Sequence, residues 1–491
     1  MDYRVLSRIL GLLLMLLAAA MLACLVFAVA DKELHPETHE AIRAFSISTA
    51  VSLVVALALY SLGRKPEDAL LRKEAVAIVG LGWALCALVG SLPYMLCEPA
   101  LPPVAAFFES MSGFTTTGST VIDELGEYPP SVLLWRSLTQ WLGGMGILVL
   151  FVAVLSFLGV GSKSIFRHES SGYGAGGFKA RIRETAMTLW RIYLLLTLLC
   201  AAGLMALGMS AYDALNHAFT AISTGGFSPR DQSIAYYGSL RIELWLTLFM
   251  ALGGCSFMLF AWLLRGRLER WRSEEENKLY LALLALAFLV VTAGLTLTRT
   301  IDSPGEAARL AVFQVVSLMT TTGYVSADYD SWPQALKALL LALMFIGGCA
   351  GSTAGGIKVG RVLLFFRIAR AELVSAFRPV RVIPLRLNGR VAHEDVRPQT
   401  LFFIAFSGFL LAAGTLLVSA FEPRFDLASS FSAAVAALFN IGPGLGMVGP
   451  TATFSGLQPQ THLLLCLLML LGRLELFAVL VLFIPSLWRK Y

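Results

Sequence analysis

Four short turns rich in hydroxyl residues and glycine are the parts of this 491-residue sequence that could do chemistry. Two of them share the letters TTTG, at 115–118 and 320–323, and the others read STGG at 223–226 and NIG at 440–442. Glycine permits backbone torsions that turn carbonyl oxygens inward. A ring of four such strands can replace the hydration shell of a monovalent cation, so the turns predict a cation site made of backbone oxygens.

A single turn of this kind has a simpler explanation as a helix C-cap, with glycine in the left-handed conformation and threonine hydroxyls bonded to the last helical turn. The repetition favours a shared site. If Gly118, Gly225, Gly323 and Gly442 are equivalent, they are 107, 98 and 119 residues apart, which is a regular period. Ser112 and Ser317 each lie six residues before their glycine, and Phe108 and Phe313 each lie ten before.

The composition places these turns in a membrane protein. Hydrophobic residues make up 57% of the chain and charged residues only 14%, against roughly 25% charged residues in a soluble domain. Apolar runs long enough to cross a bilayer, which takes about 20 helical residues, recur throughout and begin with 9–30 and 41–62. Arg4, Arg8 and the small residues 28–30 also resemble a signal peptide, but the apolar run is long and favours a retained helix.

Each turn follows a short amphipathic run that lies between two spanning runs. The short runs are 104–114, 212–222, 306–319 and 426–439. Each is too short to cross the bilayer and return, so we expect four half-helices that enter and leave on one side. Non-helical backbone at that depth must be buried in protein or line water.

The sequence therefore predicts an all-α polytopic membrane protein with an internal repeat. Two N-terminal helices are followed by four units of helix, re-entrant pore helix and helix around one pore, with about 10 transmembrane helices and 4 pore helices. The predicted boundaries are 1–70 for the N-terminal pair and 71–162, 163–266, 267–392 and 393–491 for the four repeats.

Basic residues report the orientation of the chain. Of the 38 Lys and Arg, 28 lie near the two termini or in 64–73, 163–191, 265–278 and 358–397. The positive-inside rule makes these segments and both termini cytoplasmic. The formal charge of +6 thus reflects topology, and we expect no nucleic-acid partner. The seven cysteines lie mostly in apolar runs and indicate no disulfide framework.

A glycine-rich segment, GGCAGSTAGGIKVGR at 347–361, interrupts a membrane run of the third repeat. It does not match a phosphate-binding loop, because Lys358 is one place late and no hydroxyl follows it. A kink for close helix packing is one explanation. We favour a flexible intramembrane loop at 347–356 below the turns, because broken backbone there must be buried or face a pore.

Arg473 lies near the middle of the last apolar run. A lipid-facing arginine at that depth costs several kcal/mol, so we expect it to face the pore, to pair with Glu475, or to bind carbonyls of the loop. A purely structural pair with Glu475 remains an alternative. Outside the membrane, the segment 380–396 alternates apolar and basic residues around Asn388–Gly389, which predicts a cytoplasmic hairpin or a simple solvated connection.

The motifs GFTTTGS, STGGF, TTTGY and NIGPG, with the extra N-terminal helix pair, resemble the TrkH/KtrB/HKT superfamily of potassium transporters, and within it the bacterial TrkH branch. The resemblance covers nearly the whole chain. It implies a potassium selectivity filter, for which glycine at all four equivalent positions favours potassium over sodium. The fourth turn departs most from the pattern, since Asn440 and Ile441 replace hydroxyl residues and Pro443 follows.

The resemblance also assigns roles residue by residue. The filter would comprise Thr115, Thr116, Thr117, Gly118, Ser223, Thr224, Gly225, Gly226, Thr320, Thr321, Thr322, Gly323, Asn440, Ile441 and Gly442. Potassium would bind the backbone carbonyls of Thr116, Thr117, Ser223, Thr224, Thr321, Thr322, Asn440 and Ile441. The gate would comprise Gly347, Gly348, Gly351, Gly355, Gly356, Lys358 and Arg473.

By the same resemblance the chain would be a homodimer in the bacterial inner membrane, in contact with lipid, and would dock a cytosolic TrkA-like ring. NADH or ATP would bind that ring, since no dinucleotide motif follows a strand in this chain. Potassium would be its only bound cofactor. One rival function is an ion-coupled symporter for a small organic substrate, although few polar residues converge at mid-membrane. An intramembrane enzyme is disfavoured, because HExxH and GxSxG motifs are absent from the sequence.

Overall fold

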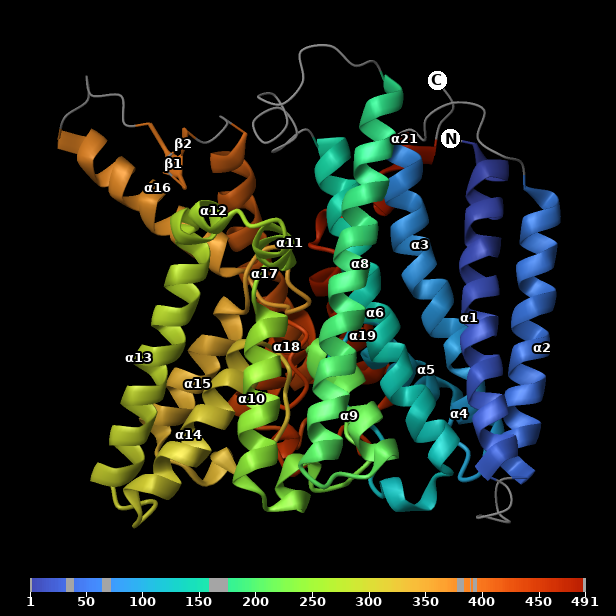
Figure 1. The fold of residues 1–491 in the computed structure, drawn as a ribbon, viewed down its shortest axis with the longest axis horizontal. Helices are drawn as coiled ribbons and strands as arrows, with labels where there is room; N and C mark the ends of the chain where they lie inside the picture. The colour runs from blue at the N-terminus through green and yellow to red at the C-terminus, as the bar shows by residue number, and fades with distance from the viewer. Residues whose placement is uncertain are drawn as a thin grey trace.

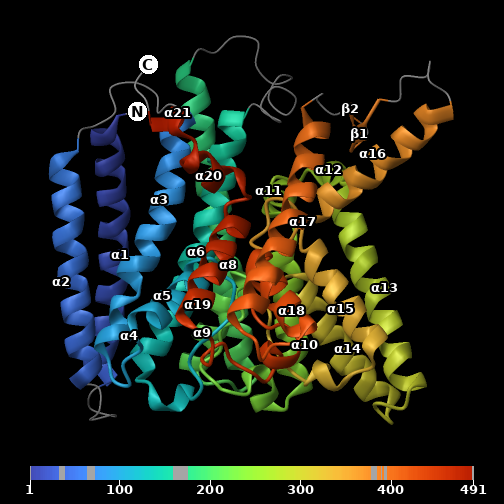
Figure 2. The ribbon, with the colours of Figure 1, turned by 180° about the vertical axis from the view of Figure 1, so that it is seen from behind.

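The computed structural model describes residues 2–31, 39–63, 72–158, 175–377, 384–388, 390–391 and 395–488. Its long helices stand side by side, and both chain termini lie at one end of the molecule (Figures 1 and 2). Helices α1 (Tyr3–Asp31) and α2 (His39–Leu62) form a pair at one edge. Their contact is close because a β-carbon on Gly11 would lie 2.7 Å from the carbonyl oxygen of Ala56.

Four repeats follow the N-terminal pair. The first contains α3 (Arg72–Gly90), α4 (Leu92–Leu96), α5 (Pro103–Phe114) and α6 (Pro130–Leu158), and the second contains α8 (Ala175–Ala206), α9 (Ala211–Ile222), α10 (Leu240–Gly254) and α11 (Phe257–Leu264). The third contains α12 (Leu268–Ser273), α13 (Glu275–Leu297), α14 (Pro304–Met319), α15 (Gln334–Ile346) and α16 (Val359–Phe377). The fourth contains α17 (Val396–Phe421), α18 (Leu427–Leu438), α19 (Pro459–Arg473), α20 (Phe477–Leu480) and α21 (Pro485–Trp488).

The predicted all-α polytopic fold is confirmed. Within the described ranges, six helices are long and apolar enough to cross a membrane, or eight if each of two bent pairs counts as one span. Helix α6, with 29 residues, and the interrupted pair α15 and α16 complete the helices of the repeats. The chain is therefore a multi-pass membrane protein.

The four short helices α5, α9, α14 and α18 occupy the half of the molecule away from the termini (Figures 1 and 2). Their starts carry the expected N-terminal signals. Ser210, Ser303 and Asp426 each accept a backbone N–H from the first turn of their helix, and α5 begins at Pro103, a favoured first position. Hydrogen bonds from Ser429 also lower the pKa of the exposed Asp426 carboxyl.

Two of the long apolar runs are broken where the sequence suggested continuity. Helices α10 and α11 meet at an angle of 92°, and α19 meets the segment 477–483 at 115°. The first break follows the Gly253–Gly254 pair, and the second contains Glu475 and Leu476 with φ of 53° and 63°. The sequence is apolar on both sides of each break, over 240–264 and 460–487, and on that composition predicts one continuous helix in each range. This prediction is wrong, because apolar composition does not register backbone hydrogen bonds made to other segments.

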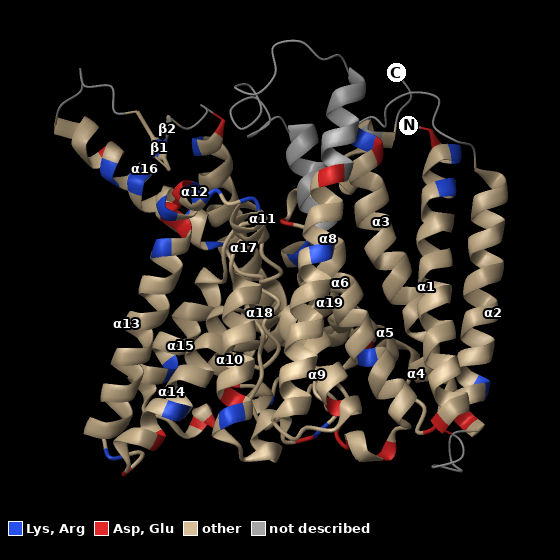
Figure 3. Cartoon of the chain, in the orientation of Figure 1, with Lys and Arg blue, Asp and Glu red and all other residues tan. Residues whose placement is uncertain are grey.

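Charges are distributed unequally between the two ends. Lys and Arg of α1, α3, α12, α13 and α16 lie at or near the end that carries the termini (Figure 3). At the same end the short strands β1 (Arg386–Leu387) and β2 (Arg390–Val391) pair antiparallel, with Arg386 opposite Val391. The predicted turn residue Asn388 lies between the two strands, and its backbone N–H donates to the Glu275 carboxylate at 2.7 Å.

Candidate functional site

The backbone shows which residues of the four turns are equivalent. The second residue after the end of each short helix has a positive φ of 51° to 56°; these residues are Thr116, Thr224, Thr321 and Asn440. Two residues later a glycine also has a positive φ, namely Gly118, Gly226, Gly323 and Gly442, at 76° to 105°. All four turns thus leave their helix along the same path.

This register corrects the expected equivalence in the second turn. Gly226, and not Gly225, matches the other three glycines. The hydrogen bonds agree, because the N–H of Gly225 donates to the carbonyl of Thr220 just as the N–H of Thr117 donates to that of Ser112. Ser223 therefore corresponds to Thr115, the first residue after the helix. Gly225 corresponds to Thr117, the residue just before the glycine of its turn.

The four turns meet in a closed ring, and each glycine faces the carbonyl oxygen of the turn that follows it in sequence, with the last facing the first. A β-carbon on Gly118 would lie 2.2 Å from the Gly225 oxygen, and one on Gly226 would lie 1.8 Å from the Thr322 oxygen. A β-carbon on Gly323 would lie 2.1 Å from the Ile441 oxygen, and one on Gly442 would lie 2.9 Å from the Thr117 oxygen. Any side chain at these glycines would displace a carbonyl of the ring.

Threonine hydroxyls hold the first and third turns from within. Thr115 Oγ1 donates to the carbonyl of Met111 at 2.7 Å and lies 2.8 Å from the Thr117 hydroxyl. Thr320 Oγ1 likewise donates to Val316 O at 2.8 Å and lies 2.7 Å from the Thr322 hydroxyl. These side chains are fully buried. The hydroxyls thus fix the turn while the backbone carbonyls remain to form the ring.

The fourth turn uses an amide instead. Asn440 Nδ2 donates to the Thr117 hydroxyl at 3.0 Å and to the Met469 carbonyl at 2.9 Å. From the first turn, Ser119 Oγ donates to the Gly442 carbonyl at 2.9 Å. NIGPG lacks the hydroxyl pair but follows the same backbone path as the other turns. Its Asn440 side chain bonds the first turn directly at Thr117.

The glycine-rich loop lies directly against the third and fourth turns. The N–H of Gly355 donates to the Thr321 hydroxyl at 2.7 Å, and the N–H of Gly356 donates to the Phe439 carbonyl at 3.1 Å. A β-carbon on Gly355 would lie 2.1 Å from that Phe439 oxygen. Gly347, Gly351 and Gly356 adopt φ of 73° to 78°, which favours glycine. The predicted interruption of the helix is thus present, and the loop passes next to the ring.

The loop also closes the break between α10 and α11. The N–H of Cys349 donates to the Gly254 carbonyl at 2.8 Å, and the N–H of Phe257 donates to the Gly351 carbonyl at 3.0 Å. The loop thereby satisfies one carbonyl at the end of α10 and one N–H at the start of α11, which a bent helix leaves without partners. Gly348 packs here, since its β-carbon would lie 2.8 Å from the Gly254 oxygen.

Arg473 is buried and binds the loop. Its Nη1 donates to the Thr353 carbonyl at 2.7 Å, and its Nη2 donates to the Gly143 carbonyl on α6 at 3.3 Å. Glu475 pairs with Arg361 at 2.6 Å, so the alternative of a structural Arg473–Glu475 pair is wrong. Lys358 is also buried, has φ of 79°, and its Nζ donates to the Ala354 carbonyl. Two cationic side chains thus contact the loop.

The oxygens of the ring are uncharged. The ring offers backbone carbonyls, and within the described ranges no group of three or more His, Cys, Asp or Glu side chains could hold a metal ion. Uncharged oxygen ligands suit a monovalent cation that must enter and leave.

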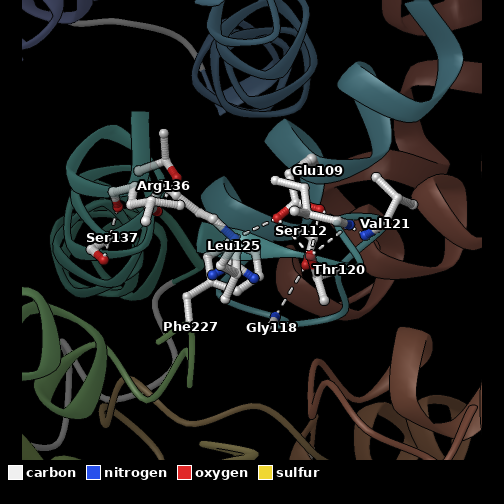
Figure 4. Close-up of polar contacts among 12 residues, drawn as sticks. Glu109, Ser112, Gly118, Thr120, Val121, Leu125, Arg136, Ser137 and Phe227 are labelled. Carbon is white, nitrogen blue, oxygen red and sulfur yellow. Dashed lines mark hydrogen bonds and ion pairs between the residues drawn. The ribbon is translucent and has the colours of Figure 1, made fainter. Parts of the chain in front are cut away.

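A buried ion pair that the sequence did not predict lies behind the first turn. Arg136 on α6 donates through Nε to Glu109 on α5 at 2.5 Å, and both side chains are buried. Glu109 also accepts the N–H of Val121 at 2.9 Å and the Thr120 hydroxyl at 3.1 Å (Figure 4). The pair therefore anchors the segment that follows the first turn. An arginine within an apolar run was the signal that could have revealed it.

Comparison with known proteins agrees with this geometry. The model of the TrkH family, described as cation transport protein, matches residues 41–490. The chain is 38% identical to the Trk system potassium uptake protein TrkH of Salmonella typhimurium and to that of Halomonas elongata, in each case over all of both chains. It is similar to the crystal structure of the potassium transporter TrkH from Vibrio parahaemolyticus, with a TM-score of 0.89 and 35% identity over all of both chains.

Replacing Glu109 by Gln should destabilise the protein, because it leaves the Arg136 guanidinium buried without a carboxylate. Removing one partner of a buried pair costs about 3–5 kcal/mol, so the variant should melt well below the wild type in detergent. The double variant E109Q/R136Q, without an uncompensated charge, should recover part of the loss. Ser137→Ala on α6 is the control, since among the described residues its hydroxyl donates to the Leu133 carbonyl of the same helix and contacts neither member of the pair. An E109Q melting temperature equal to wild type would contradict the interpretation.

Proposed function

The chain belongs to the TrkH family of cation transport proteins, and from this membership we propose that it takes up potassium across the inner membrane of a bacterium. The observation that carries the proposal is the closed ring, in which four glycines each face a carbonyl oxygen of the next turn. The relatives that match over their full length are named as potassium uptake proteins.

In the proposed filter, potassium binds the backbone carbonyls of two successive residues from each turn. With the corrected register, these are the carbonyls of Thr116, Thr117, Thr224, Gly225, Thr321, Thr322, Asn440 and Ile441. The hydrogen bonds of the threonine hydroxyls and of Asn440 support this assignment, because they hold the backbone without occupying the ring. A fixed set of carbonyl dipoles in place of water is what a potassium filter requires.

The loop 347–356 is the proposed gate. Its contacts with Thr321 and Phe439 support a position on the ion path, since both residues belong to the turns of the filter. Arg473 adds a positive charge at the loop, and a buried cation raises the barrier for another cation. The loop must move for ions to pass, and its glycines supply the backbone freedom for that movement.

The proposed orientation places both termini and the β1–β2 hairpin in the cytoplasm. The basic residues at that end support it through the positive-inside rule (Figure 3). The four short helices then enter from the outer side. The names of the relatives refer to a Trk system, which supports a multi-component assembly. We include in the proposal a homodimer and a cytosolic ring that binds NADH or ATP and acts on the gate.

Potassium uptake by the intact chain tests the proposal directly. Expressed with its regulatory partner in cells that lack their own uptake systems, the protein should restore growth at low external potassium. Gly226→Val should abolish the rescue because its side chain collides with the Thr322 carbonyl. Gly126→Val is the matched control, as a β-carbon there would meet no described residue within 4 Å apart from its own neighbours along the chain. Absence of rescue by wild-type protein that reaches the membrane with its partner would refute the function.

Gly118→Ser should weaken selectivity for potassium over sodium. The new β-carbon would lie 2.2 Å from the Gly225 oxygen, at a φ of 90° that disfavours side chains. The carbonyl must shift, and a loss of 1.4 kcal/mol in differential binding lowers the selectivity ratio about tenfold. Reversal potentials in mixed potassium and sodium solutions measure the ratio. Gly126→Ser serves as control, and an unchanged ratio in Gly118→Ser would remove Gly118 from the filter.

Arg473→Gln should increase ion flux. The substitution removes the charge that opposes cations at the loop, and it shortens the reach to the Thr353 carbonyl. Rubidium uptake into proteoliposomes is the measurement, and we expect an increase of several fold. Arg473→Lys keeps the charge and should stay near the wild-type flux. If the glutamine variant conducts no faster than the lysine variant, the charge of Arg473 is not part of the barrier.

A further inference from the structure

The second turn lacks the side chain that the other three carry at the same position. Residues Thr117, Thr322 and Ile441 occupy the third position of their turns, and Gly225 occupies it in the second. The hydroxyl pair that braces turns one and three cannot form here. The φ of Gly225 lies outside the positive range, so the backbone itself would accept a side chain at this position.

Gln140 fills this space from a different repeat. It lies on α6 and is fully buried. A β-carbon on Gly225 would lie 2.4 Å from the Cδ and Oε1 atoms of Gln140. Gln140 Nε2 donates to the Gly225 carbonyl at 2.7 Å, and its Oε1 accepts the N–H of Phe227 at 3.0 Å. The amide thus replaces the missing side chain and bonds the backbone on both sides of Gly226.

One helical turn before Gln140, Arg136 holds the following residues of the same segment. Its Nη1 donates to the Ser228 carbonyl at 2.9 Å, and its guanidinium lies 3.5 Å from the centre of the Phe227 ring. Residues four apart share a helix face, so α6 presents two side chains to residues 225–228 (Figure 4 shows Arg136 and Phe227). The first repeat therefore braces the second turn.

We propose that Gln140 is a positioning residue that fixes the Gly225 carbonyl in the ring and thereby contributes to the preference for potassium over sodium. The inference rests on the proposed function. The hydrogen bond from Gln140 to the Gly225 carbonyl affects potassium binding in two ways. The bond orients the Gly225 oxygen, which lies 2.2 Å from the position that a β-carbon of Gly118 would take. The donated N–H also polarises that oxygen and so changes its interaction with a cation. Number and field strength of carbonyl ligands set cation preference in such a filter.

The first variant to test is Gln140→Leu, which keeps the volume and removes both hydrogen bonds. Losing such a bond corresponds to about a fivefold change in an equilibrium, so the potassium-to-sodium permeability ratio should fall about fivefold while potassium still passes. Ser137→Ala, also buried on α6, should leave the ratio unchanged. A wild-type ratio in Gln140→Leu, with potassium conducted, would overturn the proposal.

A double substitution distinguishes positioning from general packing. Gly225→Thr alone should collide with Gln140 and lower the melting temperature, and Gln140→Ala alone should lower both melting temperature and selectivity. In Q140A/G225T the new hydroxyl can pair with Ser223, as Thr115 pairs with Thr117. The double variant should regain a selectivity within about twofold of wild type. Failure of the pair to recover would show that Gln140 does not stand in for the side chain.

The two hypotheses fail in different ways. If the wild-type protein conducts no potassium, the proposed function is wrong, and the melting temperatures of the wild type and the three variants of the cycle still decide whether residues 140 and 225 are coupled. Additive melting shifts would then show that Gln140 does not replace the side chain missing at residue 225, and recovery in the double variant would show that it does; a role in potassium preference would fall with the proposed function. If the wild type conducts potassium selectively and Gln140→Leu matches it, only the positioning role is wrong.

Discussion

The contact between a glycine and the carbonyl oxygen of the next turn is the constraint on which the rest of this structure depends. A β-carbon on Gly226 or Gly323 would lie within about 2 Å of an oxygen, so the ring closes only if no side chain is present at these points. The four short helices must also end at one level for the contacts to form. Their similar lengths, their capped starts and the matched torsions at their ends all satisfy this condition.

The backbone of the ring is repeated, but the side chains that support it are not. Hydroxyl pairs brace the first and third turns, Asn440 braces the fourth, and Gln140 from another repeat braces the second. Buried polar groups need hydrogen-bond partners, and in each turn a different set of side chains provides them. Divergence among the repeats is therefore limited by the hydrogen bonds that hold the carbonyls, and not by the identity of any one side chain.

The sequence alone predicted the features that recur along the chain and the one glycine-rich interruption. The four turns, the short helices that precede them and the interruption near Gly351 all follow from composition and spacing. The register of the second turn was missed because STGG offers two glycines. Thr220, a hydroxyl residue six before Gly226, matched Ser112 and Ser317 and pointed to the correct one. Gln140 was missed because a single amide within an apolar run has no periodic signal.

The breaks in the inner helices were not predicted either, because the groups that make them possible belong to a distant segment of the chain. Helices α10 and α19 are bent beneath the ring, and α15 ends there, whereas α6 continues through this level. A break costs backbone hydrogen bonds unless other groups supply them, and the loop supplies them to α10 and α11. Arg473 joins the loop at Thr353 to α6 at Gly143, where a β-carbon would lie 2.1 Å from the Phe114 oxygen. The uninterrupted α6 thus contacts the loop through Arg473 and the second turn through Gln140, so movement of the loop and the geometry of the ring share one support.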